Sequence, residues 1–290
     1  MPRKKAEAAK KSLLRHVRKQ RLKYIAILPS LVTIVNGACG FLAIVMASKG
    51  RRVEAGEFSY FAVAAYLIFL AMIADMLDGR LARMSKNTSS FGGQLDSLCD
   101  VISFGVAPAF LMLEILGGKL SAAGFADSHS LQRFVWFAAV VYMSCAVIRL
   151  ARFNVENEED ESAHMSFIGL PSPAAAGVVA SLVVFHQETL PSFDVTLYLL
   201  PLLAIGTGVL MVSRLRYPHI LNQYLRGKKP FGVLIRILFL LGLVVCMRQT
   251  ASVLIFCGFA STSVVKWLYH KAPLKRASVA EPAANLESAG

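Results

Sequence analysis

Two short stretches decide the fold of this chain: Asp75-Met-Leu-Asp-Gly-Arg-Leu-Ala-Arg83 and, after a gap of eight residues, Gly92-Gly-Gln-Leu-Asp-Ser-Leu-Cys-Asp100. Both lie at the ends of strongly apolar runs, where unpaired carboxylates are costly and usually functional. Spacings of three and four residues put the aspartates of each stretch on one face of a helix. Two such helices facing each other would gather four carboxylates, and like charges this close require cations. The four are Asp75, Asp78, Asp96 and Asp100.

The composition predicts an integral membrane protein. The chain has 290 residues, 56% of them hydrophobic, and a mean hydropathy of +0.55, which is too apolar for an ordinary soluble domain. Apolar runs of about 20 residues recur along it, each enough to cross about 30 Å of hydrocarbon. We therefore predict an all-α, polytopic bundle of about eight transmembrane helices, the last two of which could form a re-entrant pair. The spans are expected at residues 27–48, 58–77, 96–117, 132–153, 170–187, 194–213, 230–247 and 250–269.

Basic residues predict the orientation of these spans. Lys and Arg crowd the N-terminal leader, 1–26, and recur in the loops that parity places on the same side. Lys49, Arg51 and Arg52 break this pattern. On balance we expect both termini and the four aspartates on the cytoplasmic side of a bacterial cytoplasmic (inner) membrane.

The net charge of +13 does not indicate nucleic acid as a partner, because the basic residues flank membrane spans. The leader mixes its basic residues with leucines at roughly helical spacing. It therefore reads either as an amphipathic helix on anionic membrane lipid or as a plain topology signal. We expect a membrane domain at 27–215, two additional helices within 216–271 and a disordered tail at 272–290.

The aspartate segment has the composition of a two-metal site. An all-oxygen donor set suits Mg²⁺ or Mn²⁺, and two such ions roughly 3.5–4 Å apart can hold a diphosphate. Small residues beside the acids would let a nucleotide approach the helices, and the planar fork of Arg83 can reach phosphate oxygens. Asp100 is suited to bind one ion and to accept a proton from an attacking hydroxyl. The small residues are Gly79, Ala82 and Gly92.

Three other interpretations compete with this one. The acids could pair with Arg80 and Arg83 in an interfacial ion cluster, which explains a single Asp–Arg pair better than it explains four aspartates with interleaved glycines. A proton-coupled transporter also carries carboxylates within the membrane, although it explains neither the glycines nor the clustering at one edge. A polybasic membrane-anchored scaffold predicts that all four aspartates are dispensable.

The run D-x-x-D-G-x-x-A-R-x8-G-x-x-x-D-x-x-x-D is complete in this chain and resembles the signature of the CDP-alcohol phosphotransferase family. The resemblance covers roughly 27–215. It implies an integral membrane enzyme that transfers a phosphatidyl or similar group from a CDP-linked lipid to an alcohol, releases CMP and uses two Mg²⁺ or Mn²⁺ ions per site. The family is often dimeric, so a homodimer is expected.

The resemblance also implies roles for single residues. Asp75, Asp78 and Asp96 would bind the first metal, and Asp75, Asp96 and Asp100 the second, with Asp100 as the base. The cytidine diphosphate would be held by Gly79, Ala82, Arg83 and Ser89.

Three further segments are similar to the membrane-embedded phosphatidylserine synthase branch of the family: Asn36-Gly-Ala-Cys-Gly-Phe41, Arg149-Leu-Ala-Arg-Phe-Asn154 and Phe167-Ile-Gly-Leu-Pro-Ser-Pro-Ala-Ala-Ala-Gly177. They imply CDP-diacylglycerol and L-serine as substrates and direct displacement as the mechanism. The alternative acceptors are glycerol 3-phosphate, an inositol compound or choline. Asn36 could contact the CDP-lipid or form a helix-packing hydrogen bond. Candidates for substrate or phosphate binding are Arg149, Arg152, Asn154, Pro171 and Ser172.

Overall fold

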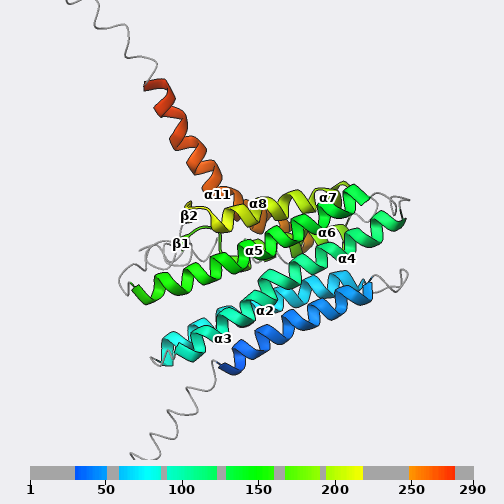
Figure 1. Ribbon diagram of the computed structural model, residues 1–290, viewed down its shortest axis with the longest axis horizontal. Helices are drawn as coiled ribbons and strands as arrows, with labels where there is room; N and C mark the ends of the chain where they lie inside the picture. The colour runs from blue at the N-terminus through cyan, green and yellow to red at the C-terminus, as the bar shows by residue number, and fades with distance from the viewer. Residues whose placement is uncertain are drawn as a thin grey trace, which may run out of the picture.

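The computed structural model describes residues 30–50, 59–85, 90–122, 129–159, 167–189, 194–217 and 248–277, which fold into long helices running side by side (Figure 1). After a first helix, Ser30–Gly50, the elements are α2 (Tyr60–Ser85), α3 (Ser90–Asp100), the π-helix η1 (Val101–Val106), α4 (Ala107–Ala122), α5 (His129–Glu159), β1 (Phe167–Ile168), α6 (Ser172–Glu188), α7 (Val195–Tyr198), α8 (Leu200–Val212), β2 (Arg216–Tyr217) and α11 (Arg248–Ala277).

The prediction of an all-α, polytopic membrane bundle is confirmed. Five helices are long and apolar enough to cross a membrane, and they match the first four predicted spans and the sixth: Ser30–Gly50, Tyr60–Leu81, Phe91–Ala122, His129–Val155 and Val195–Val212. A helix satisfies its own backbone hydrogen bonds, which is why such apolar segments adopt this form in lipid.

The predicted total of eight spans is not confirmed. The fifth predicted span corresponds to α6, whose 17 residues lie at the lower limit for crossing a bilayer. The eighth corresponds to the apolar stretch Thr250–Val265 within α11, which is shorter than a typical span. The seventh, 230–247, lies outside the described residues, as do the leader and the end of the tail.

Small residues let the helices approach one another closely. The buried core is rich in alanine, including Ala43, Ala64, Ala138 and Ala176, while large apolar side chains such as Phe41 and Trp136 are exposed. This distribution is typical of membrane bundles, in which the outer surface faces lipid tails and close backbone packing stabilises the interior.

The third span differs from its prediction in one respect. It begins at Ser90 rather than at residue 96, and directly after Asp100 its backbone widens into η1. The hydroxyl of the fully buried Tyr142 on α5 donates a hydrogen bond of 3.0 Å to the carbonyl oxygen of Phe104 in this segment. Single π-helical turns inside α-helices occur frequently at functional sites.

A short β-pairing ties the loop after α5 to the end of α8. Phe167 pairs with Tyr217 and Ile168 with Arg216, in antiparallel register. The following residue, Gly169, has a φ of 83°, and a Cβ there would collide with the carbonyl oxygen of Met211. Pro171 then occupies the N-cap position of α6, directly before Ser172.

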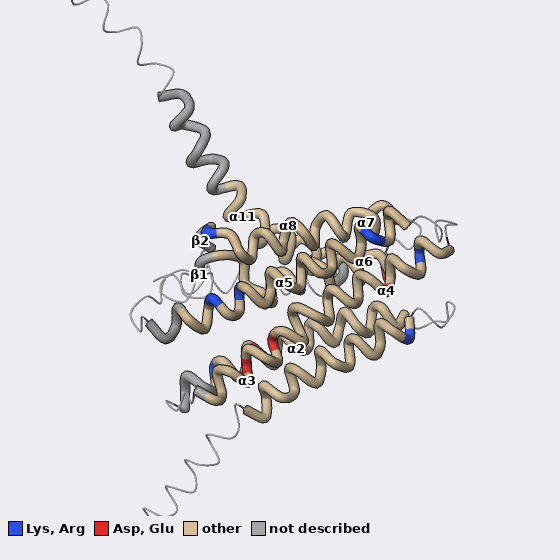
Figure 2. Tube along the Cα trace, in the orientation of Figure 1, with Lys and Arg blue, Asp and Glu red and all other residues tan. Residues whose placement is uncertain are grey.

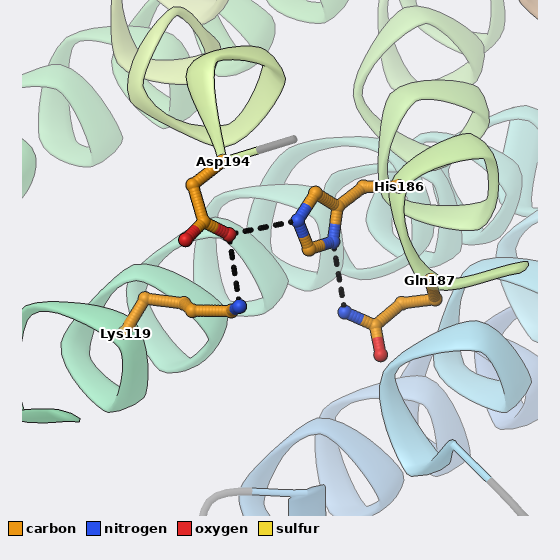
Figure 3. Close-up of polar contacts among 4 residues, drawn as sticks. All are labelled: Lys119, His186, Gln187 and Asp194. Atoms are coloured by element: carbon orange, nitrogen blue, oxygen red, sulfur yellow. Dashed lines mark hydrogen bonds and ion pairs between the residues drawn. The ribbon is translucent and has the colours of Figure 1, made fainter. Parts of the chain in front are cut away.

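A polar network joins the other ends of these helices (Figure 3). Asp194 Oδ1 lies 2.8 Å from Lys119 Nζ and 3.1 Å from His186 Nε2. Gln187 Nε2 donates to His186 Nδ1 over 3.2 Å, and Ser59 Oγ donates to Gln187 Oε1 over 2.7 Å. Since Nδ1 accepts, His186 carries its proton on Nε2 and donates it to Asp194. The network links α2, α4 and α6 to the turn before α7.

Candidate active site

Helices α2 and α3 bring three of the four predicted carboxylates together. One oxygen each from Asp75, Asp78 and Asp96 lies within 4.8 Å of the others. We call these three residues the aspartate cluster. Figure 2 shows the acidic positions of α2 and α3 close together. The structure therefore brings together three of the four carboxylates that the spacing argument expected at one site.

The aspartate cluster fits a bound divalent cation. Asp78 is only 4% exposed, and its Oδ2, like Asp96 Oδ1, is a buried atom without a hydrogen-bond partner among the described residues. Buried acceptors without donors are expensive, and a cation beside them removes that cost. Because every donor is a carboxylate oxygen, a hard ion such as Mg²⁺ or Mn²⁺ suits the site better than a soft one.

Asp100 lies beside the aspartate cluster. Its carboxylate is 7% exposed and is close enough to Asp75 and Asp96 for their charges to repel. Asp100 Oδ1 accepts a hydrogen bond of 2.9 Å from Nδ2 of Asn36 on the first helix. Another residue of that helix, Thr33, hydrogen-bonds to Asp78. The first helix therefore holds one carboxylate from each aspartate stretch.

Arg149 on α5 reaches the same site. It is 8% exposed, and its guanidinium interacts electrostatically with Asp100 and Asp75. Its Nη1 donates a hydrogen bond of 2.8 Å to Ser172 Oγ at the start of α6, and its Cζ lies 5.5 Å from the centre of the Phe153 ring. A buried position facing two acids is not that of an arginine that merely marks the membrane interface.

The ion-cluster interpretation finds no support in the described side chains, among which no ion pair joins the four aspartates to Arg80 or to Arg149. The side chain of Arg83 is outside the described part, so its pairing is not tested.

The other candidates on α5 contact neighbouring helices. Arg152 Nη1 donates to the carbonyl oxygen of Val212 at the end of α8, over 3.1 Å. Asn154 Nδ2 lies 2.8 Å from Oγ of Ser97, which follows Asp96 on α3. Both contacts position helices that border the site. Ser172 is fully buried against Arg149, and Pro171 precedes it.

The residues expected to hold the cytidine diphosphate follow the aspartates along the same two helices. A Cβ built on Gly79 would meet no atom of the described residues within 4 Å, so within the described part this glycine packs against no other helix and leaves open space beside Asp78. Gly92 lies on α3 and Ala82 in the last turns of α2. The side chains of Ala82 and Arg83 are outside the described part, as is Ser89.

Sequence reasoning named Asn36 but missed Thr33 and the contacts of the first helix with the aspartates. Thr33, Asn36 and Gly40 have spacings of three and four and therefore share one helix face. Gly40 packs so closely that an added Cβ would lie 2.7 Å from the Cα of Ser103. A stripe of polar and small residues along an apolar span is the signal that could have revealed this face.

Comparisons with known proteins agree with this geometry. A family model described as CDP-alcohol phosphatidyltransferase matches residues 26–213. A CDP-diacylglycerol–serine O-phosphatidyltransferase of Helicobacter pylori (strain ATCC 700392 / 26695) is 34% identical over 242 residues, covering 83% of this chain and 91% of that protein. Proteins with the same name are 34% identical in Methanocaldococcus jannaschii, over 70% of this chain and 79% of the relative, and 31% identical in Bacillus subtilis (strain 168), over 66% and 90%.

Proposed function

The chain belongs to the CDP-alcohol phosphatidyltransferase family, and from this premise we propose that it transfers the phosphatidyl group of CDP-diacylglycerol to the hydroxyl of L-serine. The products are phosphatidylserine and CMP. The observation that carries the proposal is the convergence of three carboxylate oxygens within 4.8 Å on α2 and α3. The names of the relatives favour serine over the other acceptors.

The four aspartates would hold two divalent ions, Mg²⁺ or Mn²⁺. Asp75, Asp78 and Asp96 would be the ligands of one, and Asp75, Asp96 and Asp100 would be the ligands of the other. When bound, such ions neutralise the diphosphate and stabilise the departing phosphate oxygen. The unpartnered oxygens of Asp78 and Asp96 support this assignment.

Asp100 acts on the acceptor. Its carboxylate takes the proton from the serine hydroxyl, and the serine oxygen forms a bond to the phosphorus that carries the diacylglycerol. The bond from that phosphorus to the oxygen of CMP breaks, and CMP leaves with the electron pair. The acceptor supplies the nucleophile, so no covalent enzyme intermediate is required.

Arg149 binds the carboxylate of serine. A guanidinium can hold a carboxylate with two parallel hydrogen bonds, and the bond to Ser172 fixes its orientation. Its nearness to Asp100 places this positive charge beside the proposed base. Arg152, Asn154 and Pro171 form the wall of the acceptor site.

The cytidine diphosphate lies over the last turns of α2 and the first turns of α3. The open space at Gly79 supports this position. The residues proposed to contact it are Gly79, Ala82, Arg83, Ser89 and Gly92.

The protein works as a homodimer whose active site faces the cytoplasm of a bacterial inner membrane. Its basic leader binds anionic lipid. Basic flanks on the side of the aspartate cluster support this orientation.

The decisive experiment measures CMP release by purified protein in mixed micelles with CDP-diacylglycerol and Mn²⁺ or Mg²⁺. L-Serine, glycerol 3-phosphate, inositol and choline are offered separately, with Asp96→Asn as the control. We expect release that requires serine and disappears in the variant. Release with another alcohol would overturn the acceptor, and a well-folded protein that releases no CMP with any of them would overturn the proposed reaction.

A further inference from the structure

We propose that Asn36 is a positioning residue that holds the carboxylate of Asp100 at the edge of the aspartate cluster. The inference rests on the proposed function, in which Asp100 is the base. Its starting point is the hydrogen bond of 2.9 Å from Asn36 Nδ2 to Asp100 Oδ1, which joins two residues 64 positions apart.

The orientation of the Asn36 amide follows from chemistry. An ionised carboxylate only accepts hydrogen bonds, so the NH₂ group must face Asp100 and the amide oxygen must point away. That oxygen is buried and has no partner among the described residues, and the whole side chain is 0% exposed. A buried acceptor without a donor destabilises the fold. The residue therefore contributes less to stability than its burial would suggest, which favours a role in the site.

The backbone beneath Asn36 is held in place. Its carbonyl oxygen accepts a hydrogen bond of 2.9 Å from Ser103 Oγ. A Cβ added to Gly37 would lie 2.9 Å from Cys99 Sγ, so the first helix is in direct contact with α3 just before Asp100. An amide on a support this rigid can fix the direction of the carboxylate that it contacts.

Asp100 needs such support because of its surroundings. Asp75 and Asp96 repel it, and Arg149 attracts it from α5. Unsupported, the side chain would rotate away from the aspartate cluster and toward the guanidinium. A neutral donor on Oδ1 opposes this rotation without neutralising the charge, and it leaves Oδ2 for the ion and for the acceptor proton that the proposed function assigns to Asp100.

This role differs from direct contact with the CDP-lipid. A residue that binds the nucleotide needs a hydrogen-bonding group that the ligand can reach. One N–H of the Asn36 amide is used by Asp100, and the side chain is fully buried, so a ligand in the site cannot reach its remaining polar groups. Its replacement is therefore expected to change turnover more than the KM for CDP-diacylglycerol.

The first test compares Asn36→Leu, which has the same branched shape without polar atoms, and Asn36→Ser, smaller and still polar, with Ser103→Ala. The control removes the other buried hydrogen bond between the same two segments. We expect both Asn36 variants to lose roughly 10- to 100-fold in kcat, the scale of a misplaced catalytic group, with the KM for both substrates within about threefold. Ser103→Ala removes only part of the support of the Asn36 backbone, because the contact between Gly37 and Cys99 remains, so we expect a smaller loss of kcat than in either Asn36 variant.

A second test separates positioning from packing. The double variant Asn36→Asp/Asp100→Asn restores the hydrogen bond with donor and acceptor exchanged. Relative to Asn36→Asp alone, we expect the double variant to recover the unfolding temperature and the affinity for CMP, both measured by calorimetry. Turnover should stay lost, because the carboxylate then lies on the first helix instead of on α3.

Four outcomes would overturn the inference. Recovery of turnover in the double variant would make the pair structural only. An increased KM for CDP-diacylglycerol with unchanged kcat in both Asn36 variants would make Asn36 a ligand contact. Full activity of both Asn36 variants, measured beside an active wild type, would show that Asn36 does not position Asp100. The proposed function would not be affected. A wild type that releases no CMP would overturn the proposed function and this role together.

Discussion

Asp96 is the residue whose replacement best separates chemistry from folding. The variant Asp96→Asn keeps the volume of the side chain and removes one negative charge from a group of acids that repel one another. We expect CMP release to fall by more than about 100-fold while the unfolding temperature stays the same or rises. Thermal unfolding in detergent, recorded beside the CMP assay, measures both quantities. Substantial activity in this variant would contradict the two-metal site.

Arg149 and Arg152 allow a second comparison between single residues. Arg149 faces two acids and contacts Ser172, whereas Arg152 contacts a backbone carbonyl at the end of α8. Lysine keeps the charge but cannot make two parallel hydrogen bonds to a carboxylate. We expect Arg149→Lys to raise the KM for serine by roughly 10-fold, or about 1.4 kcal/mol, and Arg152→Lys to change it less. Steady-state kinetics with varied serine decide between them, and the reverse order would make Arg152 the contact.

The sequence predicted which single residues lie together where both residues belong to the same helix. Spacings of three and four residues are enough to predict that Asp75 and Asp78 share a face, and that Asp96 and Asp100 do. The contact between Asn36 and Asp100 joins two helices that the sequence alone does not orient. The partner of a lone polar residue in a span therefore remained open until the packing was known.

At the scale of helices, the polar network of Figure 3 connects α2, α4 and α6 to the turn before α7. His186 is 1% exposed, so removing its acceptor leaves a buried N–H without a partner. We expect Asp194→Ala to lower the free energy of unfolding by about 1–3 kcal/mol. CMP release at 25 °C should not change, because the aspartate cluster lies at the other end of the helices. Denaturant unfolding and the CMP assay test the two parts, and a variant that loses turnover while folded would contradict them.

The same network predicts a dependence of stability on pH. The hydrogen bond from Lys119 holds the pKa of Asp194 below its usual range. A carboxylate with a lowered pKa in the folded state stabilises the protein above its unfolded pKa, about 3.9, and loses this contribution as the pH falls through its folded pKa. We expect Asp194→Asn to show a flatter dependence of unfolding temperature below about pH 4 than the wild type. If the unfolding temperatures of the wild type and the variant fall identically below about pH 4, the Lys119–Asp194 pair contributes nothing to stability. Exposed ion pairs often contribute nothing measurable.

The transmembrane helices could be predicted from sequence where the length of an apolar run determines them. Runs of about 20 apolar residues predicted the spans that the structure confirms, because lipid leaves helices as the form that satisfies the backbone. The widening at Val101–Val106 was not predictable, since it depends on the first helix and Tyr142 packing around that segment. The pairing of Phe167 with Tyr217 joins distant loops and has no local signal.

On the scale of the whole molecule, the distance between the aspartate cluster and the Lys119 network predicts the topology. Lys119 follows Asp100 by nineteen residues on a continuous helical span, a rise of about 28 Å, which is close to the thickness of the hydrocarbon core. We therefore expect the two polar sites on opposite sides of the membrane, with the cluster on the cytoplasmic side that the basic flanks predict.

This topology can be measured by labelling one exposed position near each of the two polar sites. Gln94 on α3 is exposed near the aspartate cluster, and Thr189 is exposed at the end of α6 near the Lys119 network. In a variant whose native cysteines are replaced by alanine or serine, we expect Thr189→Cys to react with an impermeant maleimide applied to spheroplasts. Gln94→Cys should react only after the membrane is permeabilised, because CDP-diacylglycerol and serine would be used on the cytoplasmic side. The opposite labelling pattern would place the active site outside the cell and contradict the orientation, whereas equal labelling of both positions before permeabilisation would contradict a spanning arrangement altogether.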